Sequence, residues 1–200
     1  MSAGASAEVV YTLATSEHGD ALSGLYARAG VACHCRFWHF TGTNNDWLGR
    51  VAHEPGTNQG EMLAALATRS GEMQGMVALH EGDAVGWMKL APVNAVKKLY
   101  DQRLYRNLPV LQGDREGVVA IGCFLVDPAW RHRGVARGLL AAGVEWAREN
   151  GVHAIEAFPR RAPELRDEEA FTGPVSLFLD QGFAVVHDFA PYPVLRLGLK

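Results

Sequence analysis

The chain has 200 residues, of which 48% are hydrophobic and 20% are charged, values typical of a globular protein. They exclude a disordered or a fibrous chain, and the length predicts one domain spanning residues 1–200. The net charge of −3 supplies no general positive field for nucleic acid or acidic membranes. An anion site would therefore need a local cluster of positive charge.

The number of cysteines and the length of the apolar runs indicate the cellular compartment in which the protein is expected. The chain has 3 cysteines, and an odd number argues against a disulfide framework. Residues 1–8 lack the basic start and the apolar stretch of a signal peptide. The longest apolar run, 118–126, is far shorter than the ~20 residues of a membrane span. We therefore expect a soluble protein of the reducing cytoplasm, with neither nucleic acid nor a membrane as partner.

Hydrophobic periodicity predicts the elements of the first half of the chain. In chain order these are a strand over 9–15, a helix over 18–29, an irregular aromatic segment over 33–50, a helix over 59–69, strands over 73–80 and 84–90, and a helical stretch over 92–104. Residues 81–83, Glu-Gly-Asp, form a tight hairpin-turn signal between the two strands. This half is therefore expected to contain a hairpin flanked by helices.

The second half carries the clearest pattern. Its expected elements are a strand over 118–126, a helix over 134–150, a strand over 153–158, a short helix over 176–181, and strands over 183–188 and 194–199. Strand, helix and strand in this order imply a parallel pair with a right-handed crossover. The sequence thus predicts an α/β domain with one βαβ unit flanked by hairpins.

The turn before the predicted helix reads Arg-His-Arg-Gly-Val-Ala-Arg-Gly from Arg131. The first turn of a helix exposes unpaired N–H groups that carry partial positive charge. Gly134 and Ala136 have little or no side chain, so a phosphate could approach the backbone. Arg131, Arg133 and Arg137 add fixed positive charge. The pattern indicates a pyrophosphate-binding turn.

Other phosphate-binding motifs fit this turn less well. The chain contains no Gly-x-x-x-x-Gly-Lys-Ser/Thr string, as a P-loop requires. A dinucleotide-binding Gly-x-Gly-x-x-Gly aligned on Gly134 meets Ala136 and Leu139 at its other glycine positions, although Glu156 imitates the ribose-binding acid. A solvated basic helix start is the plain structural alternative.

Three motifs in order resemble the GNAT superfamily of acetyl-CoA-dependent N-acetyltransferases. Arg-x-x-Gly-x-Ala from Arg131 matches that family's Arg/Gln-x-x-Gly-x-Gly/Ala turn. Phe-x-Val-x-Pro from Phe124 is similar to its Leu-x-Val-x-Pro strand end. Residues 178–183, Phe-Leu-Asp-Gln-Gly-Phe, resemble its Tyr-x-x-x-Gly-Phe segment. The order of strands and helices also fits, so the resemblance spans most of the chain.

The resemblance implies a mixed α/β (α+β) fold: a mostly antiparallel sheet with a central splayed parallel strand pair and helices on both faces. The pair should separate near Val126 and Phe158. Acetyl-CoA is the implied co-substrate, with no metal. The residues expected to contact it are Phe124, Leu125 and Val126 along the pantetheine, Arg131, His132, Arg133, Gly134, Val135, Ala136 and Arg137 around the pyrophosphate, and Phe178.

The transfer chemistry needs a base for the amine and an acid for the leaving thiolate. Glu156 is the expected general base, because it lies between apolar strand neighbours, where partial burial raises a carboxyl pKa. The alternatives are a half-exposed strand residue or a partner for Arg131 or Arg160. The family's usual acid is a tyrosine, but this chain has Phe178 there. Tyr192, Ser176 or water would have to replace it.

The segment from Cys33 to Phe40 leaves several interpretations open. Cys33, Cys35 and His39 could supply zinc ligands, although their spacing is unlike a zinc knuckle and we predict no metal there. A buried aromatic layer is the alternative. A third interpretation is an acceptor-site wall made of Phe37, Trp38 and Trp47. Cys123, within an apolar strand, is expected to be a small buried hydrophobe.

The sequence therefore predicts a single-domain N-acetyltransferase that moves an acetyl group to a primary amine of a small molecule or peptide. A non-catalytic acyl-CoA-binding sensor remains the alternative, and a dinucleotide-dependent oxidoreductase a more distant one. The sequence identifies no particular acceptor and leaves a homodimer open.

Overall fold

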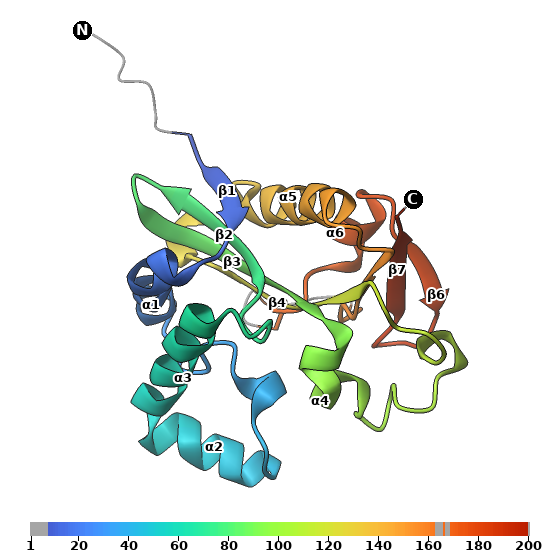
Figure 1. Ribbon diagram of the computed structural model, residues 1–200, viewed down its shortest axis with the longest axis horizontal. Coiled ribbons are helices and arrows are strands. Elements are labelled where there is room, and N and C mark those ends of the chain that lie inside the picture. Colours follow the sequence, from blue (N-terminus) through green and yellow to red (C-terminus); the bar gives the residue numbers. More distant parts are fainter. Residues whose placement is uncertain (1–7, 163–165, 167–168, 200) are drawn as a thin grey trace, which may run out of the picture.

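The structure is a computed structural model that describes residues 8–162, 166 and 169–199. Seven strands form one sheet in the order β1-β2-β3-β4-β5-β7-β6 (Figure 1). The strands are β1 (Val10–Leu13), β2 (Gly75–His80), β3 (Asp83–Pro92), β4 (Val118–Val126), β5 (Ala154–Ala157), β6 (Ala184–His187) and β7 (Val194–Gly198). β4 and β5 run parallel, and the other neighbouring pairs run antiparallel. The predicted mixed fold with a central parallel pair is confirmed.

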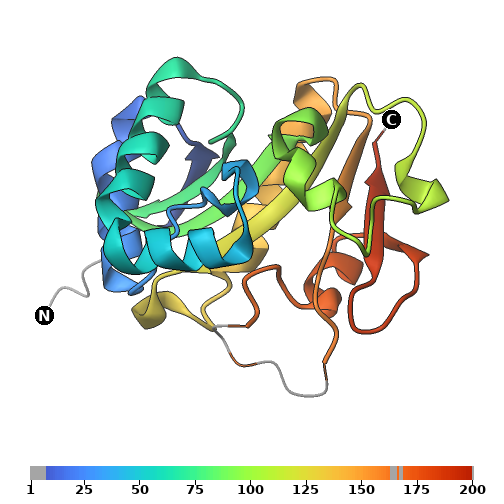
Figure 2. The same cartoon turned by 90° about the horizontal axis from the view of Figure 1, so that it is seen from below.

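Helices cover both faces of this sheet, as expected. α5 (Val135–Glu149) and α6 (Val175–Leu179) lie on one face. The opposite face carries α1 (Gly19–Arg28), α2 (Asn44–His53), α3 (Pro55–Thr68) and α4 (Lys97–Tyr100), which lie in front of the sheet in Figure 2. The sheet is thus the middle layer of the molecule.

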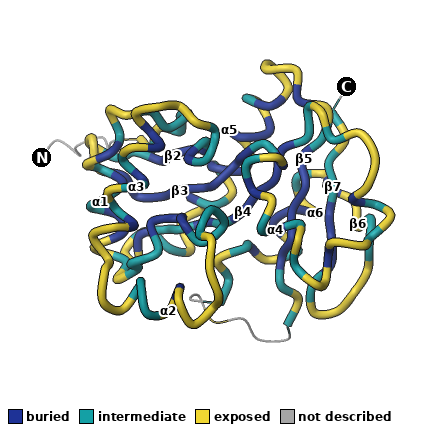
Figure 3. The backbone as a smooth tube through the Cα atoms, turned by 60° about the horizontal axis from the view of Figure 1, so that its bottom comes forward, coloured by how far each residue is buried: buried dark blue, intermediate teal, exposed yellow. Residues whose placement is uncertain are grey.

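The core lies on both sides of the central strands, which are the most continuously buried parts of the chain (Figure 3). The apolar stripe of α5 packs there through Leu139, Leu140 and Val144. Gly143 lets the helix approach closely, because a Cβ there would stand 2.5 Å from Cε of Met88. The close packing of α5 on the sheet fixes where its N-terminus points.

Two segments differ from the sequence-based expectation. Residues 33–50 were expected to be irregular, but α2 begins at Asn44, where Thr43 and Asp46 cap each other: the Thr43 N–H donates to Asp46 at 2.9 Å and the Asp46 N–H to the Thr43 hydroxyl at 3.2 Å. The helical stretch expected over 92–104 is shorter, because a 3₁₀ turn (Val93–Val96) and α4 are followed by turns.

Candidate functional site

The site is built around the start of α5. Gly134 is the N-cap residue, with a φ of 83° in the left-handed region that favours glycine, and no side chain caps the helix. A Cβ added at Gly134 would meet no atom of the described residues within 4 Å, so the space beside Gly134 is open there. The N–H groups of the first turn lack partners within the helix and carry its partial positive charge. The turn can therefore receive an anion.

The connection from β4 to this turn is held by Asp127. Its carboxylate caps the 3₁₀ turn Pro128–Trp130 by accepting the Ala129 N–H at 3.0 Å. The other oxygen accepts from Nε of Arg28 at 2.6 Å, which ties the connection to the end of α1. The start of α5 is thereby fixed relative to the end of β4.

A cavity of about 780 Å³ begins at this helix start and follows the second half of β4. This volume suits an organic ligand of cofactor size. Nine of the residues predicted to bind acetyl-CoA line it: Phe124, Leu125, Val126, Arg131, His132, Gly134, Val135, Ala136 and Arg137. The remaining walls come from the end of α1, the segment 31–38 and the segment 170–180. The structure thus brings most of the predicted site into one cavity.

Two predicted residues lie outside the lining of this cavity. Arg133 packs its guanidinium over the ring of Trp130 at 5.5 Å. Phe178 is fully buried in the core, with its ring centre 6.1 Å from Phe124 and 5.4 Å from Phe183. Its contact with the pantetheine stays a prediction. The positive charge of Arg137 is partly neutralised by Asp180, whose carboxylate lies 3.0 Å from Nη2 of Arg137.

The parallel strands separate earlier than expected on β4, but at the expected place on β5. Their pairing ends at Ile121 opposite Ala157, whereas the sequence placed the split near Val126 and Phe158. The register of β4 against β3 shifts at the same level, as a β-bulge does, and a bulge bends the strand away. Beyond it, the Phe124 N–H donates to the carbonyl of Phe171 at 2.6 Å. The expected pantetheine position on β4 is therefore adjacent to the segment that carries Phe171.

Glu156 lies away from this cavity, fully buried on β5 and surrounded by cations. Arg115 binds it with both terminal nitrogens, at 3.0 and 2.5 Å. Nε of Arg196 donates at 3.0 Å, and the Tyr100 hydroxyl donates at 2.7 Å. Burial, followed by the charge of Glu156, raises the pKa of Tyr100. The role of Glu156 as general base stays a prediction. Its contacts with Arg115, Arg196 and Tyr100 give Glu156 a structural role.

The inner end of the cavity is aromatic and sulfur-rich. Phe37 and Trp38 line it, and the indole N–H of Trp38 donates to the carbonyl of Gly122 at 3.1 Å. Trp47 stands behind them, edge-on to Phe37 at 5.4 Å, and is outside the lining. The cavity wall also contains Cys33, Cys35 and Cys123. Among the described residues, no three His, Cys, Asp or Glu side chains gather in a metal-binding arrangement.

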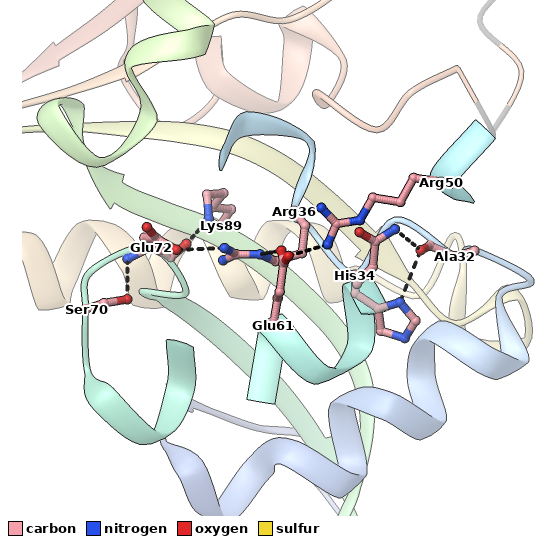
Figure 4. A network of polar contacts seen from close by, with 9 residues as sticks. Ala32, His34, Arg36, Arg50, Glu61, Ser70, Glu72 and Lys89 are labelled. Carbon is pink, nitrogen blue, oxygen red and sulfur yellow. Dashed lines mark hydrogen bonds and ion pairs between the residues drawn. The ribbon is translucent and has the colours of Figure 1, made fainter. Parts of the chain in front are cut away.

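A polar network of largely buried cations and half-exposed carboxylates lies next to this wall (Figure 4). Arg36 donates to Glu72 at 2.7 Å and to Glu61 at 3.2 Å, and Arg50 also pairs with Glu61. Nζ of Lys89, a fully buried residue of β3, donates to the backbone carbonyl of Glu72. No local sequence pattern predicts this network. Its one signal was a lysine inside the apolar strand 84–90, since a buried lysine requires partners.

Across the part of the chain that the structure describes, no helix is long and apolar enough to cross a bilayer. The sequence also offers the charged segment 160–169 either as a cover for the acceptor site or as a solvated surface loop, and this segment lies partly outside the described residues.

Comparisons with known proteins agree with this geometry. The Acetyltransferase (GNAT) family model matches residues 40–166. No curated protein sequence matches the chain. Among solved structures, the PaiA N-acetyltransferase of Thermoplasma acidophilum in complex with coenzyme A has a TM-score of 0.56 at 9% identity, over 96% of this chain and 99% of that one. A GNAT family acetyltransferase from Brucella melitensis in complex with acetyl-CoA has a TM-score of 0.53 at 14% identity, over 96% and 89%.

A third solved structure, a GNAT family acetyltransferase from Streptococcus pneumoniae, has a TM-score of 0.56 at 15% identity. It covers 96% of this chain and 100% of that one. At identities this low, the structural similarity establishes a shared fold and nothing more. The match of the family model, which spans more than half of the chain, establishes the family.

Proposed function

Because the chain belongs to the GNAT acetyltransferase family and is an acyltransferase, we propose that it moves the acetyl group of acetyl-CoA to a primary amine of a small molecule or peptide. The observation that carries the proposal is the open, uncapped start of α5 at the mouth of a cavity that follows β4. A pyrophosphate needs such a set of backbone donors, and Gly134 leaves room for it.

In this proposal the pyrophosphate lies over residues 132–137, with Arg131 beside it. The pantetheine extends along Phe124 to Val126, and one of its carbonyls accepts the Phe124 N–H in place of Phe171. The thioester then lies where β4 and β5 separate, near the aromatic wall of Phe37 and Trp38. This inner wall is the proposed acceptor side.

The reaction is direct attack of a neutral amine on the thioester carbonyl. The amine nitrogen forms the new C–N bond and gives up a proton to water, the C–S bond breaks, and the thiolate of CoA leaves. Holding the two reactants together supplies much of the rate. Of the hydroxyl groups expected to protonate the thiolate, Ser176 lines the cavity and Tyr192 does not. Ser176 or water is therefore the proposed proton source.

The test is an acceptor screen with acetyl-CoA that follows N-acetylated product by mass and CoA release in parallel. We expect product with at least one class of primary amine, and binding of CoA but not of NAD by calorimetric titration. CoA binding without turnover on any amine would favour the acyl-CoA-binding sensor. Binding of NAD instead of CoA would contradict the cofactor assignment.

A further inference from the structure

Cys35 and Cys123 meet at the inner end of the cavity, although 88 positions separate them in sequence. Their Sγ atoms are 2.9 Å apart, and both thiols are free. Cys35 is buried, Cys123 on β4 is half-buried, and both line the cavity. Exposed Ser176 and Asp180 line the same cavity, so the cavity whose wall contains the two cysteines opens to solvent.

Cys35 is held in this position by an unusual backbone conformation. His34 and Cys35 both have positive φ values, 43° and 57°, in the left-handed region that residues with side chains rarely adopt. The next residue, Arg36, is anchored by Glu61 and Glu72 (Figure 4). Strained backbone that surrounding contacts maintain is typical of functional positions. The segment therefore keeps the Cys35 sulfur directed at Cys123.

Donor groups surround the Cys35 sulfur. The Tyr26 hydroxyl and the Trp87 indole N–H are buried, and neither makes a hydrogen bond, to sulfur or otherwise, with any described residue. Both lie beside Cys35, together with the ammonium group of buried Lys89. Burial alone would raise the pKa of Cys35, but the hydrogen bond from Cys123 and the Lys89 charge lower it. That same hydrogen bond, reinforced by burial, raises the pKa of Cys123.

Cys33 has a different environment. Burial, with the charge of Cys35 next, raises the pKa of Cys33 to about 11. A thiolate is the reactive form of cysteine, so Cys33 should react slowly although it lines the same cavity. The environments of the three cysteines therefore differ: the pKa of Cys35 is lowered, whereas the pKa values of Cys123 and Cys33 are raised.

We propose that Cys35 and Cys123 form an oxidisable dithiol, a modification site for small peroxides at the inner end of the cavity. The Cys35 thiolate attacks one peroxide oxygen, the O–O bond breaks, and the departing hydroxide takes up a proton to become water. Cys35 is then a sulfenic acid. The Cys123 sulfur attacks the Cys35 sulfur, the S–O bond breaks, and the leaving hydroxide takes the Cys123 proton as a second water. The two thiols lose two electrons and the peroxide gains them.

The product is a disulfide between the segment before α2 and β4, next to the point where β4 and β5 separate. It removes the thiolate charge beside Lys89 and links two walls of the cavity. A covalent link across 88 positions also restricts the unfolded chain. Oxidation should therefore raise the midpoint of thermal unfolding by several degrees.

The test treats the full-length reduced protein with a small molar excess of hydrogen peroxide. Free thiols counted after denaturation should fall from the 3 of the sequence to one, with a mass loss of about 2 Da. Peptide mapping should find Cys35 joined to Cys123, and dithiothreitol should restore all thiols. Unchanged thiols, a bond that includes Cys33, or a disulfide between two molecules would overturn the proposal.

Matched serine variants assign the two steps. Cys33→Ser should form the same link, while Cys123→Ser should stop at a Cys35 sulfenic acid that a 1,3-dione probe traps. In Cys35→Ser, Cys123 should react at least about tenfold more slowly than Cys35 does in the native chain. Equal rates at Cys33 and Cys35 in the native protein would also contradict the assignment. That comparison needs no variant, so it stands even if a substitution prevents folding.

Discussion

At the scale of single residues, Gly134 is where the proposed cofactor site depends on a missing side chain. We expect Gly134→Val to weaken CoA binding by about tenfold or more, or ~1.4 kcal/mol, because a branched side chain would occupy the pyrophosphate position. Calorimetric titration with CoA measures the change. Its matched control is Gly151→Val after the other end of α5, because Gly151 also has a positive φ and open space around it.

The two variants share the backbone strain of a valine at positive φ, so a common fall in stability is expected of both. Only Gly134 lies in the cavity lining. Unchanged CoA affinity in folded Gly134→Val, or an equal loss in Gly151→Val, would contradict the pyrophosphate assignment.

A substitution of Glu156 tests whether this residue has a structural role or is the general base. Its carboxylate neutralises Arg115 and Arg196 in a buried position, so we expect Glu156→Gln to lower the free energy of unfolding by about 2–3 kcal/mol. Denaturant titration measures it, with Glu145→Gln on the exposed side of α5 as control. A loss of two to four powers of ten in kcat at unchanged stability would instead establish Glu156 as the general base, in line with the ~10²–10⁴-fold range of such catalysis.

At the scale of elements, substitutions can distinguish the role of the aromatic wall, Phe37 and Trp38, from that of the cofactor site at the start of α5. Trp38→Phe removes the indole donor to Gly122 and, because the new ring is smaller, widens the cavity near the separated strands. We expect a rise of about tenfold in the acceptor KM with little change in CoA affinity, since a lost hydrogen bond and contact are worth ~1–1.5 kcal/mol. Steady-state kinetics with the acceptor identified by the screen would measure it.

Trp47→Phe is the matched control for this wall. Trp47 packs on Phe37 and Phe40 but does not line the cavity, so its acceptor KM should stay near the native value. A larger effect at Trp47 than at Trp38 would show that packing of the segment, and not contact with the acceptor, controls KM.

The elements differ in how far the sequence predicts them. β4 and α5 follow from a local pattern, an apolar run and an amphipathic stripe, and the turn between them carries its own glycine and arginines. The predicted strand bounds of β4, Val118–Val126, are those of the structure. The segment before α2 has no such period, because its conformation depends on Glu61, Glu72 and Lys89 from elsewhere in the chain.

The contrast between local patterns and long-range contacts also explains which parts of the candidate site the sequence predicts. The cofactor side is a property of one turn, so the sequence located it. The pairing of Glu156 with two arginines and of Cys35 with Cys123 needs partners about 40 and 88 positions away, which no local spacing encodes. Cys123 was expected to be a small buried hydrophobe. In the structure it is half-buried, and its thiol contacts the thiol of Cys35.

At the scale of the whole molecule, His39 couples stability to pH. Burial, with the charges of Lys89 and Arg36, lowers the pKa of His39 to about 4. An unfolded histidine titrates near ~6.5. Between these values the unfolded chain binds a proton that the folded chain does not, so the free energy of unfolding falls as pH falls. Above ~6.5 both states are neutral at this residue and its contribution no longer changes with pH.

We therefore expect thermal unfolding to shift to lower temperature from about pH 6.5 to pH 4, with part of the slope due to His39. His39→Gln removes the titrating group, so its midpoints should depend less on pH across this window, and the two curves should run parallel above it. Scanning calorimetry at half-unit pH steps measures both. Equal slopes between pH 6.5 and 4 would mean that the folded protein protonates His39 as readily as the unfolded chain does.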